Sequence, residues 1–354
     1  MEPSRSYYYD INRIYLMIIG QWPYQKPKER MIFFVSIMIL TASSLFLQIK
    51  HLTDRLFVDW DMFETKEEYD IMRKYAETGR WYALIYGSFI YVGTVVFAST
   101  ALVPRILDVL FPLNTSRPIL LPYPAYYFVD ENQYFYYIFS HMLITSSICM
   151  SGVVAHDTTF FVYVEHVCGL FAVVGFRFGH VSHKRSTMEK NMLNYPDAVY
   201  HKNIVISIYA HHKALQFAEF LESTFTISFA VQLLIVTVGL SITLVQLSIQ
   251  LHNLAEAMRY FLFIFAQLFH LFCLSFQGQK LIDHSIETCD KIYCGPWYTI
   301  PVKEHRLLMF VMRRSIDASV LTAGKIYVFS LRNFTAVVQS SMSYFTLLSS
   351  FDVS

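Results

Sequence analysis

The chain has 354 residues, of which 55% are hydrophobic and only 16% charged, and its formal net charge is +1. Ordinary globular proteins are about 45–50% apolar and about 25% charged, so this composition excludes a typical soluble domain. The absence of a large basic excess also argues against a nucleic-acid binder. Because several stretches of about 20 residues carry almost no charge, the sequence predicts an all-α, polytopic helical membrane protein in a lipid bilayer.

The order of polar and apolar segments predicts where the chain crosses the membrane. Residues 1–30 are polar and basic, which by the positive-inside rule predicts a cytoplasmic N-terminus. A transmembrane helical domain is expected over 31–276, with spans at about 31–49, 81–103, 134–156, 225–249 and 257–276. Residues 50–80 are also rich in basic side chains, although one crossing separates them from the N-terminus. This conflict leaves the orientation of residues 50–133 open.

The loop after the second apolar run has few basic residues and several prolines, and we expect it outside the cell. Asn114, in the triplet Asn-Thr-Ser, is a candidate for N-glycosylation there. Such triplets are also common by chance in a chain of this length.

Residues 134–180 are apolar for more than forty positions and contain few charges. No cluster of Gly and Pro interrupts them near Asp157, so we expect one long helix rather than two spans. Asp157 and Glu165 are costly if they face lipid, which places them in helix contacts, near the inner interface or beyond the membrane. Amphipathic stretches within 157–222 and 277–321 predict cytoplasmic helical extensions and an anchor segment.

The C-terminal segment 322–354 is predicted to form the last span. Polar side chains recur in it at steps of three or four, along one helix face: Thr335, Gln339, Ser343, Thr346 and Ser350. Two interpretations remain open. The hydroxyls bond to backbone carbonyls or to a neighbouring helix, or the stripe lines a pore in an oligomer.

No pattern of catalytic or metal-binding residues is present in the sequence. His180 and His183 share a helix face, but two imidazoles make a poor metal site. We find no Gly-rich phosphate loop and no Ser/His/Asp arrangement. The sequence therefore predicts no enzyme, no cofactor and no metal site.

A small-molecule site should be an apolar, aromatic-lined cavity with a few polar anchors. The outer halves of the predicted spans supply seven candidates, for each of which ordinary helix packing is the alternative role. They are Tyr91, Thr94, Tyr137, His141, Met142, Thr145 and Tyr260.

Several motifs are spread over nearly the whole chain. They are Gly20-Gln21-Trp22-Pro23, Asp59-Trp60 followed by EEYDIMRKYAETGR, HDTTFFVYVEHVCGLFAVVGFRF, FAEFLESTF, GQKLIDHS, Trp297-Tyr298, Arg313-Arg314-Ser315, Thr322-Ala323-Gly324-Lys325 and Ser343-Tyr344-Phe345-Thr346. Together they resemble the insect odorant receptors, specifically their variable, odour-tuned subunits.

This resemblance implies a seven-span subunit of a non-selective cation channel, opened by a small volatile hydrophobic ligand. The subunit would form a tetrameric hetero-oligomer with an olfactory co-receptor in the plasma membrane of olfactory neuron dendrites. The last half-helix would line the pore, and helices four to six would extend into a cytoplasmic anchor. The resemblance also implies a second span before Asp59-Trp60, and we expect that this span is missing here. Alternatives are a G-protein-coupled receptor, against which the basic N-terminus argues, and a gustatory-type chemoreceptor.

Overall fold

The computed structural model describes residues 49–111, 117, 120–123, 125–131, 133–181, 197–250 and 254–351. The chain divides into two compact units, Met1–Met62 and Phe63–Ser354. Residues 49–60 of the first unit are helical. The predicted N-terminal segment, the span 31–49 except its last residue, and Asn114 lie outside the described residues, and they stay predictions. That the second span of the family is missing also stays a prediction.

The second unit consists mainly of long helices, which confirms the prediction of an all-α polytopic membrane protein. In the described residues, four helical stretches are long and apolar enough to cross a membrane: Lys66–Leu110, Phe135–Gly179, Tyr200–Ile249 and Glu256–Tyr293. The first comprises α3 (Lys66–Ser99), a 3-10 turn (Thr100–Leu102) and α4 (Val103–Leu110). The others lie in α5 (Phe135–Gly179), α6 (Asp197–Ile249) and α7 (Leu254–Tyr293).

Helix α5 is a single helix of 45 residues, as the lack of a Gly and Pro cluster predicts. It packs against α3, α6 and α7. In its most apolar stretch, 78% of the residues are buried within the chain, against 11–39% in the other three. A helix that is apolar on all sides needs burial on all sides, so α5 forms the centre of this unit.

Helix α3 begins well before the span predicted at 81–103. The Thr65 hydroxyl accepts the backbone N–H of Glu68 at 3.3 Å, and the Glu68 carboxylate accepts the N–H of Glu64 at 3.0 Å. These two bonds satisfy amide groups that a helix start leaves without partners. The amphipathic stretch and the span are therefore one continuous helix.

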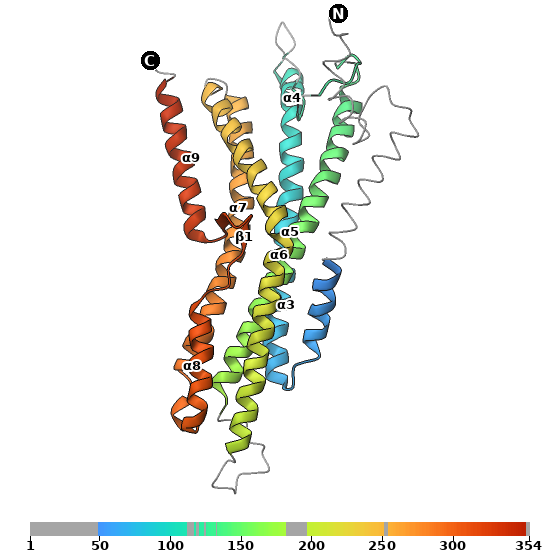
Figure 1. The fold of residues 1–354 in the computed structure, drawn as a ribbon. Helices are drawn as coiled ribbons and strands as arrows, with labels where there is room; N and C mark the ends of the chain where they lie inside the picture. Colours follow the sequence, from blue (N-terminus) through green and yellow to red (C-terminus); the bar gives the residue numbers. More distant parts are fainter. Residues whose placement is uncertain are drawn as a thin grey trace, which may run out of the picture. The chain divides into compact units, whose positions relative to one another are not determined.

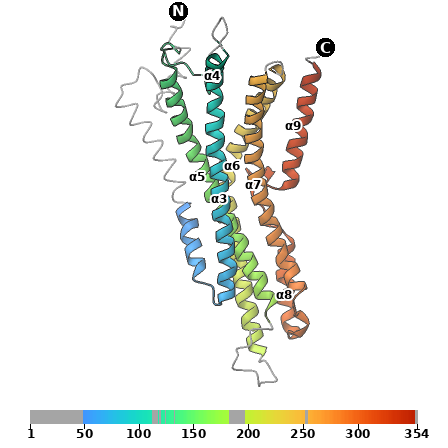
Figure 2. The same cartoon turned by 180° about the vertical axis from the view of Figure 1, so that it is seen from behind.

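A second core lies where the ends of α5 and α7 meet the start of α6 and helix α8 (Val302–Ile316). Glycine and proline in CGPWYTIP end α7 at Tyr293, and a 3-10 turn, Trp297–Thr299, leads into α8. The buried side chains of this core are Val174, Phe178, Val181, Ile204, Ile292, Ile300, Leu308 and Val311. Figures 1 and 2 show α8 beside one end of α7 and the last helix, α9 (Leu331–Phe351), beside the other.

The prediction that the last span begins at Thr322 is wrong, because the C-terminal helix begins at Leu331. Residues 322–330 instead contain an antiparallel hairpin of β1 (Thr322–Ala323) and β2 (Tyr327–Val328). Its turn needs positive φ angles, +61° at Gly324 and +58° at Lys325, and glycine adopts that conformation without strain. The backbone N–H of Gly324 also donates to the Thr226 carbonyl at 2.9 Å, which fixes the turn on α6.

Candidate functional site

The seven predicted ligand-binding residues lie on α3, α5 and α7. Their burial ranges from Met142, fully buried, to Tyr137, which is 78% exposed. The Tyr91 hydroxyl lies 2.8 Å from the Ser151 hydroxyl, so this residue joins α3 to α5. His141 Nδ1 is 2.9 Å from the Tyr127 hydroxyl, in the segment before α5.

The other three members of this group have ordinary helix environments. The Thr94 hydroxyl donates to the carbonyl of Ile90 in its own helix at 2.8 Å. Thr145 and Tyr260 are half-buried. That the seven residues bind a ligand stays a prediction.

An arginine that the sequence interpretation did not identify ties the loop between α4 and α5 to α7. Arg259 donates to the backbone carbonyls of Leu121 and Pro122, and its guanidinium lies 5.4 Å from the centre of the Phe97 ring. One side chain therefore links α7, α3 and the segment between α4 and α5. Its contacts with two carbonyls and a ring could be found only from the fold.

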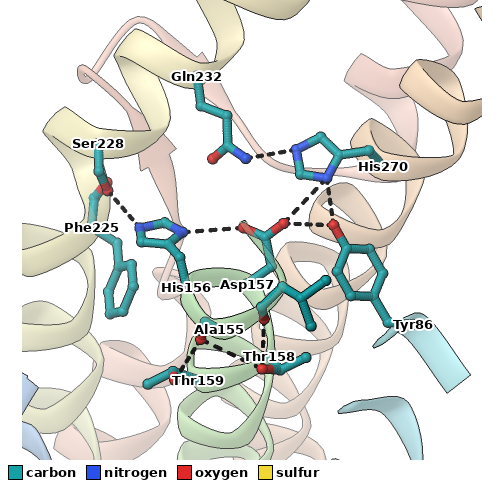
Figure 3. A network of polar contacts seen from close by, with 11 residues as sticks. Tyr86, Ala155, His156, Asp157, Thr158, Thr159, Phe225, Ser228, Gln232 and His270 are labelled. Carbon is teal, nitrogen blue, oxygen red and sulfur yellow. Dashed lines mark hydrogen bonds and ion pairs between the residues drawn. The ribbon is translucent and has the colours of Figure 1, made fainter. Parts of the chain in front are cut away.

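A buried polar network joins the same helices at the level of Asp157, whose side chain is fully buried (Figure 3). The Tyr86 hydroxyl donates to Asp157 Oδ2 at 2.6 Å and lies 2.8 Å from His270 Nδ1. On the other side, His156 Nδ1 lies 3.1 Å from Asp157 Oδ1. Residues of α3, α5 and α7 thus meet around one carboxylate.

Two residues of α6 complete this network. The Gln232 amide nitrogen donates to His270 Nε2 at 2.8 Å, and Ser228 lies 3.1 Å from His156 Nε2. If His270 is neutral with its proton on Nδ1, all its contacts are satisfied, because Nε2 then accepts from Gln232 and Nδ1 donates towards Tyr86. The carboxylate that the sequence places in a helix contact is therefore a junction of four helices.

Two further carboxylates are buried as ion pairs. Glu165 Oε1 accepts from Lys280 Nζ at 2.5 Å, which links α5 to α7. Glu68 accepts from Arg177 Nε at 2.9 Å and from Nη2 at 2.8 Å, which links α3 to α5 in a two-point geometry. The carboxylate side chains of Glu165 and Glu68 are each 1% exposed. These pairs place Glu165, like Asp157, in helix contacts, one of the places expected from the sequence.

Helix α9 presents two different faces. Thr335, Gln339, Ser343 and Thr346 are exposed, whereas residues on the other side of the helix face α6 and α7. The Thr335 and Ser343 hydroxyls donate to the carbonyls of Leu331 and Gln339 at 2.8 and 2.9 Å. These bonds match the first interpretation of the stripe, and its exposure leaves the pore interpretation available. Ser350 lies in α9, but its side chain is outside the described part.

A cavity of about 630 Å³ lies between α9, α6, α7 and the hairpin. None of the seven predicted ligand-binding residues lines it. Its walls combine leucines and valines with small polar residues of α9, a pattern that looks like ordinary span packing in the sequence. In the described residues, no group of three or more His, Cys, Asp or Glu side chains is placed to hold a metal ion.

Comparison with known proteins gives consistent matches. Residues 24–342 match the family model described as 7tm Odorant receptor. Odorant receptor 33b of Drosophila melanogaster is 26% identical over 146 residues, which cover 41% of this chain and 38% of that protein. Odorant receptor 33a of the same species is 25% identical over 264 residues, covering 73% of this chain and 66% of that protein. The chain thus spans less than two thirds of the length of these curated relatives.

The fold is similar to that of a solved receptor. The structure of the insect olfactory receptor OR5 from Machilis hrabei in complex with eugenol matches with a TM-score of 0.57 at 12% identity, covering 99% of this chain and 98% of that one. A structure of the same receptor, described without eugenol, matches with a TM-score of 0.51 at 13% identity. At such identity the likeness concerns the fold alone. The family match, which extends over most of the sequence, shows that this membrane protein belongs to the 7tm odorant receptor family.

Proposed function

We propose that the chain is an odour-tuned subunit of a cation channel that opens when a small volatile hydrophobic molecule binds. In this proposal it assembles with an olfactory co-receptor in the plasma membrane of olfactory neuron dendrites. Membership of the odorant receptor family supports the receptor role. The membrane-crossing helices support the location in a membrane.

The division of α9 into two faces is the observation that carries the channel part. One face is built of Asn333, Ala336, Val337, Ser340 and Ser341, which line the cavity towards α6 and α7. The opposite face carries the exposed polar stripe. Polar groups on a membrane helix need protein or water as neighbours. Several copies of α9 around an axis would direct the stripe into a water-filled pore.

Bulky apolar substitutions in the stripe test this assignment. Gln339→Leu and Ser343→Leu should change single-channel conductance or ion selectivity, because they replace polar groups that contact permeating ions. Val338→Leu is the control, since Val338 is half-buried and lies outside the stripe. All variants are co-expressed with the co-receptor and compared at matched surface expression. Unchanged conductance and selectivity in both stripe variants would contradict a pore-lining α9.

The ligand-binding group is tested separately on α5. Tyr137→Ala and His141→Ala should shift the concentration of odorant that gives a half-maximal current. Currents evoked by an agonist of the co-receptor should remain, because that agonist does not use this subunit's pocket. A parallel loss of both responses would show that these substitutions damage assembly and not ligand binding.

The core shared by α5, α6, α7 and α8 supports the proposed cytoplasmic anchor within 157–222 and 277–321. Helix α8 carries Arg313 and Arg314 in its last turn, and α7 carries Lys291 in its last turn. Basic residues favour the cytoplasmic side of a membrane. In this proposal the end of the second unit that carries α8 is cytoplasmic, and α9 lies towards the opposite surface (Figure 1).

A further inference from the structure

The cavity behind α9 has the size of a small-molecule site. Its volume of about 630 Å³ falls within the roughly 300–1,000 Å³ typical of such sites. We call it the α9 cavity. Its lining residues are Val236, Thr237, Leu240, Ser241, Leu244, Val245, Gln267, Leu268, Leu271, Ile326, Tyr327, Asn333, Ala336, Val337, Ser340 and Ser341. None of these described side chains is charged, so the walls favour a neutral and largely apolar occupant.

Four of the five wall hydroxyl groups donate to backbone carbonyls and offer an occupant only hydrogen-bond acceptors; the fifth, that of Tyr327, is buried without a partner among the described residues. On α6, Thr237 donates to the carbonyl of Leu233 at 2.7 Å, and Ser241 donates to that of Thr237 at 2.9 Å. On α9, Ser340 and Ser341 donate to carbonyls of their own helix at 2.8 and 2.9 Å. A hydroxyl has one proton and two lone pairs, so what these four groups present to an occupant is oxygen lone pairs.

An amide in the α7 wall adds an acceptor without a partner. Gln267 Oε1 is buried and has no hydrogen-bond partner among the described residues. Gly239 of α6 gives this amide room, because a Cβ there would lie 2.9 Å from Gln267 Nε2. The other amide of the cavity, Asn333, already donates to the Val328 carbonyl at 2.8 Å. A buried acceptor without a partner is costly, so a donor supplied by an occupant would relieve that cost.

We propose that the α9 cavity binds a small neutral molecule with an apolar body and one hydroxyl group, an alcohol or a phenol, whose hydroxyl donates to Gln267. An ether or hydrocarbon of similar size would fill the volume without supplying the donor. Because Ala336, Val337, Ser340 and Ser341 form one wall, the occupant bears directly on α9. This site is separate from the predicted ligand-binding group, and binding to it does not require channel activity.

Photolabelling of the purified full-length chain in detergent tests the proposal. The probe is a diazirine analogue of 1-octanol, and the labelled positions are mapped by mass spectrometry. We expect labels on residues 236–245, 267–271 and 333–341. Octanol should compete about two- to twelvefold better than methyl heptyl ether, because one hydrogen bond is worth roughly 0.5–1.5 kcal/mol. Equal competition, or labels confined to other positions, would overturn the proposal.

Three variants sharpen the result. Ser340→Phe fills the cavity from α9 and should abolish labelling there, whereas Ser343→Phe places the same ring on the exposed face and should leave it unchanged. Gln267→Leu should keep labelling but remove the preference for octanol over the ether. Labelling that survives Ser340→Phe, or a preference that survives Gln267→Leu, would overturn the site. The competition on the unmodified chain stays decisive if a variant fails to fold.

Discussion

Gly278 of α7 packs closely against Phe329, in the segment that leads into α9. A Cβ added there would lie 2.6 Å from the Phe329 Cβ and 2.9 Å from its carbonyl carbon, and closer still to its carbonyl oxygen. Carbon atoms in contact normally lie about 3.5–4.0 Å apart, so Gly278→Ala must displace the chain before α9 by roughly 1 Å. Most of the obstacle is backbone, which cannot rotate away as a side chain can.

The net effect on stability follows from two opposing terms. Overpacking of this kind costs about 1–3 kcal/mol, while alanine in place of glycine favours a helix by about 1 kcal/mol. Gly152→Ala on α5 is the control, because nothing lies within 4 Å of its added Cβ and only the favourable term remains. We expect Gly278→Ala to lower the melting temperature of the detergent-purified chain and Gly152→Ala to leave it unchanged or raise it.

Equal changes in the melting temperature of the two variants would refute this reasoning. If both variants change the melting temperature by the same amount and in the same direction, the close contact between α7 and Phe329 does not constrain the chain. A second readout is functional, since Phe329 lies two positions before α9 begins. Gly278→Ala should change channel opening in co-expressing cells, while Gly152→Ala should not.

Two further predictions concern buried polar groups. Lys280→Met should lower the free energy of unfolding by about 3–5 kcal/mol, because Glu165 is left buried without its cation. The double variant with Glu165→Leu should recover much of that loss. Thermal melts of both purified variants measure this, and a single variant as stable as the unmodified chain would contradict it. Tyr86→Phe should lower the free energy of unfolding by about 1–3 kcal/mol, because it removes the donor to Asp157. Tyr91→Phe should lower it less, because the Tyr91 hydroxyl makes an exposed contact. Equal melting temperatures of the two variants would contradict the role of the network.

The sequence predicts the long helices well because their signal is local. Uninterrupted apolar residues around Asp157 specify one helix, and α5 is one helix of 45 residues. The start of α9 could not be predicted in this way. Thr322 to Lys325 are compatible with a helix, and what turns them into a hairpin is contact with α6 at Glu222 and Thr226, about a hundred positions earlier.

The candidate sites were likewise only partly predictable from the sequence. His156 and Asp157 are adjacent in the sequence, so a polar group there is visible without a structure. Their partners come from distant helices, since Tyr86 and His270 are separated by 184 positions. The α9 cavity was missed because its wall residues, such as Leu240 and Ser340, look like ordinary span residues. Only the placement of α9 beside α6 and α7 brings them together.

Whether this odorant receptor acts as a channel subunit is tested by an electrical recording. Cells expressing the chain with an olfactory co-receptor are challenged with a broad panel of odorants while G-protein signalling is blocked. We expect a fast, non-selective cation current that is absent when the co-receptor is expressed alone. An odour response that disappears under the blockade would contradict it and indicate a G-protein-coupled receptor.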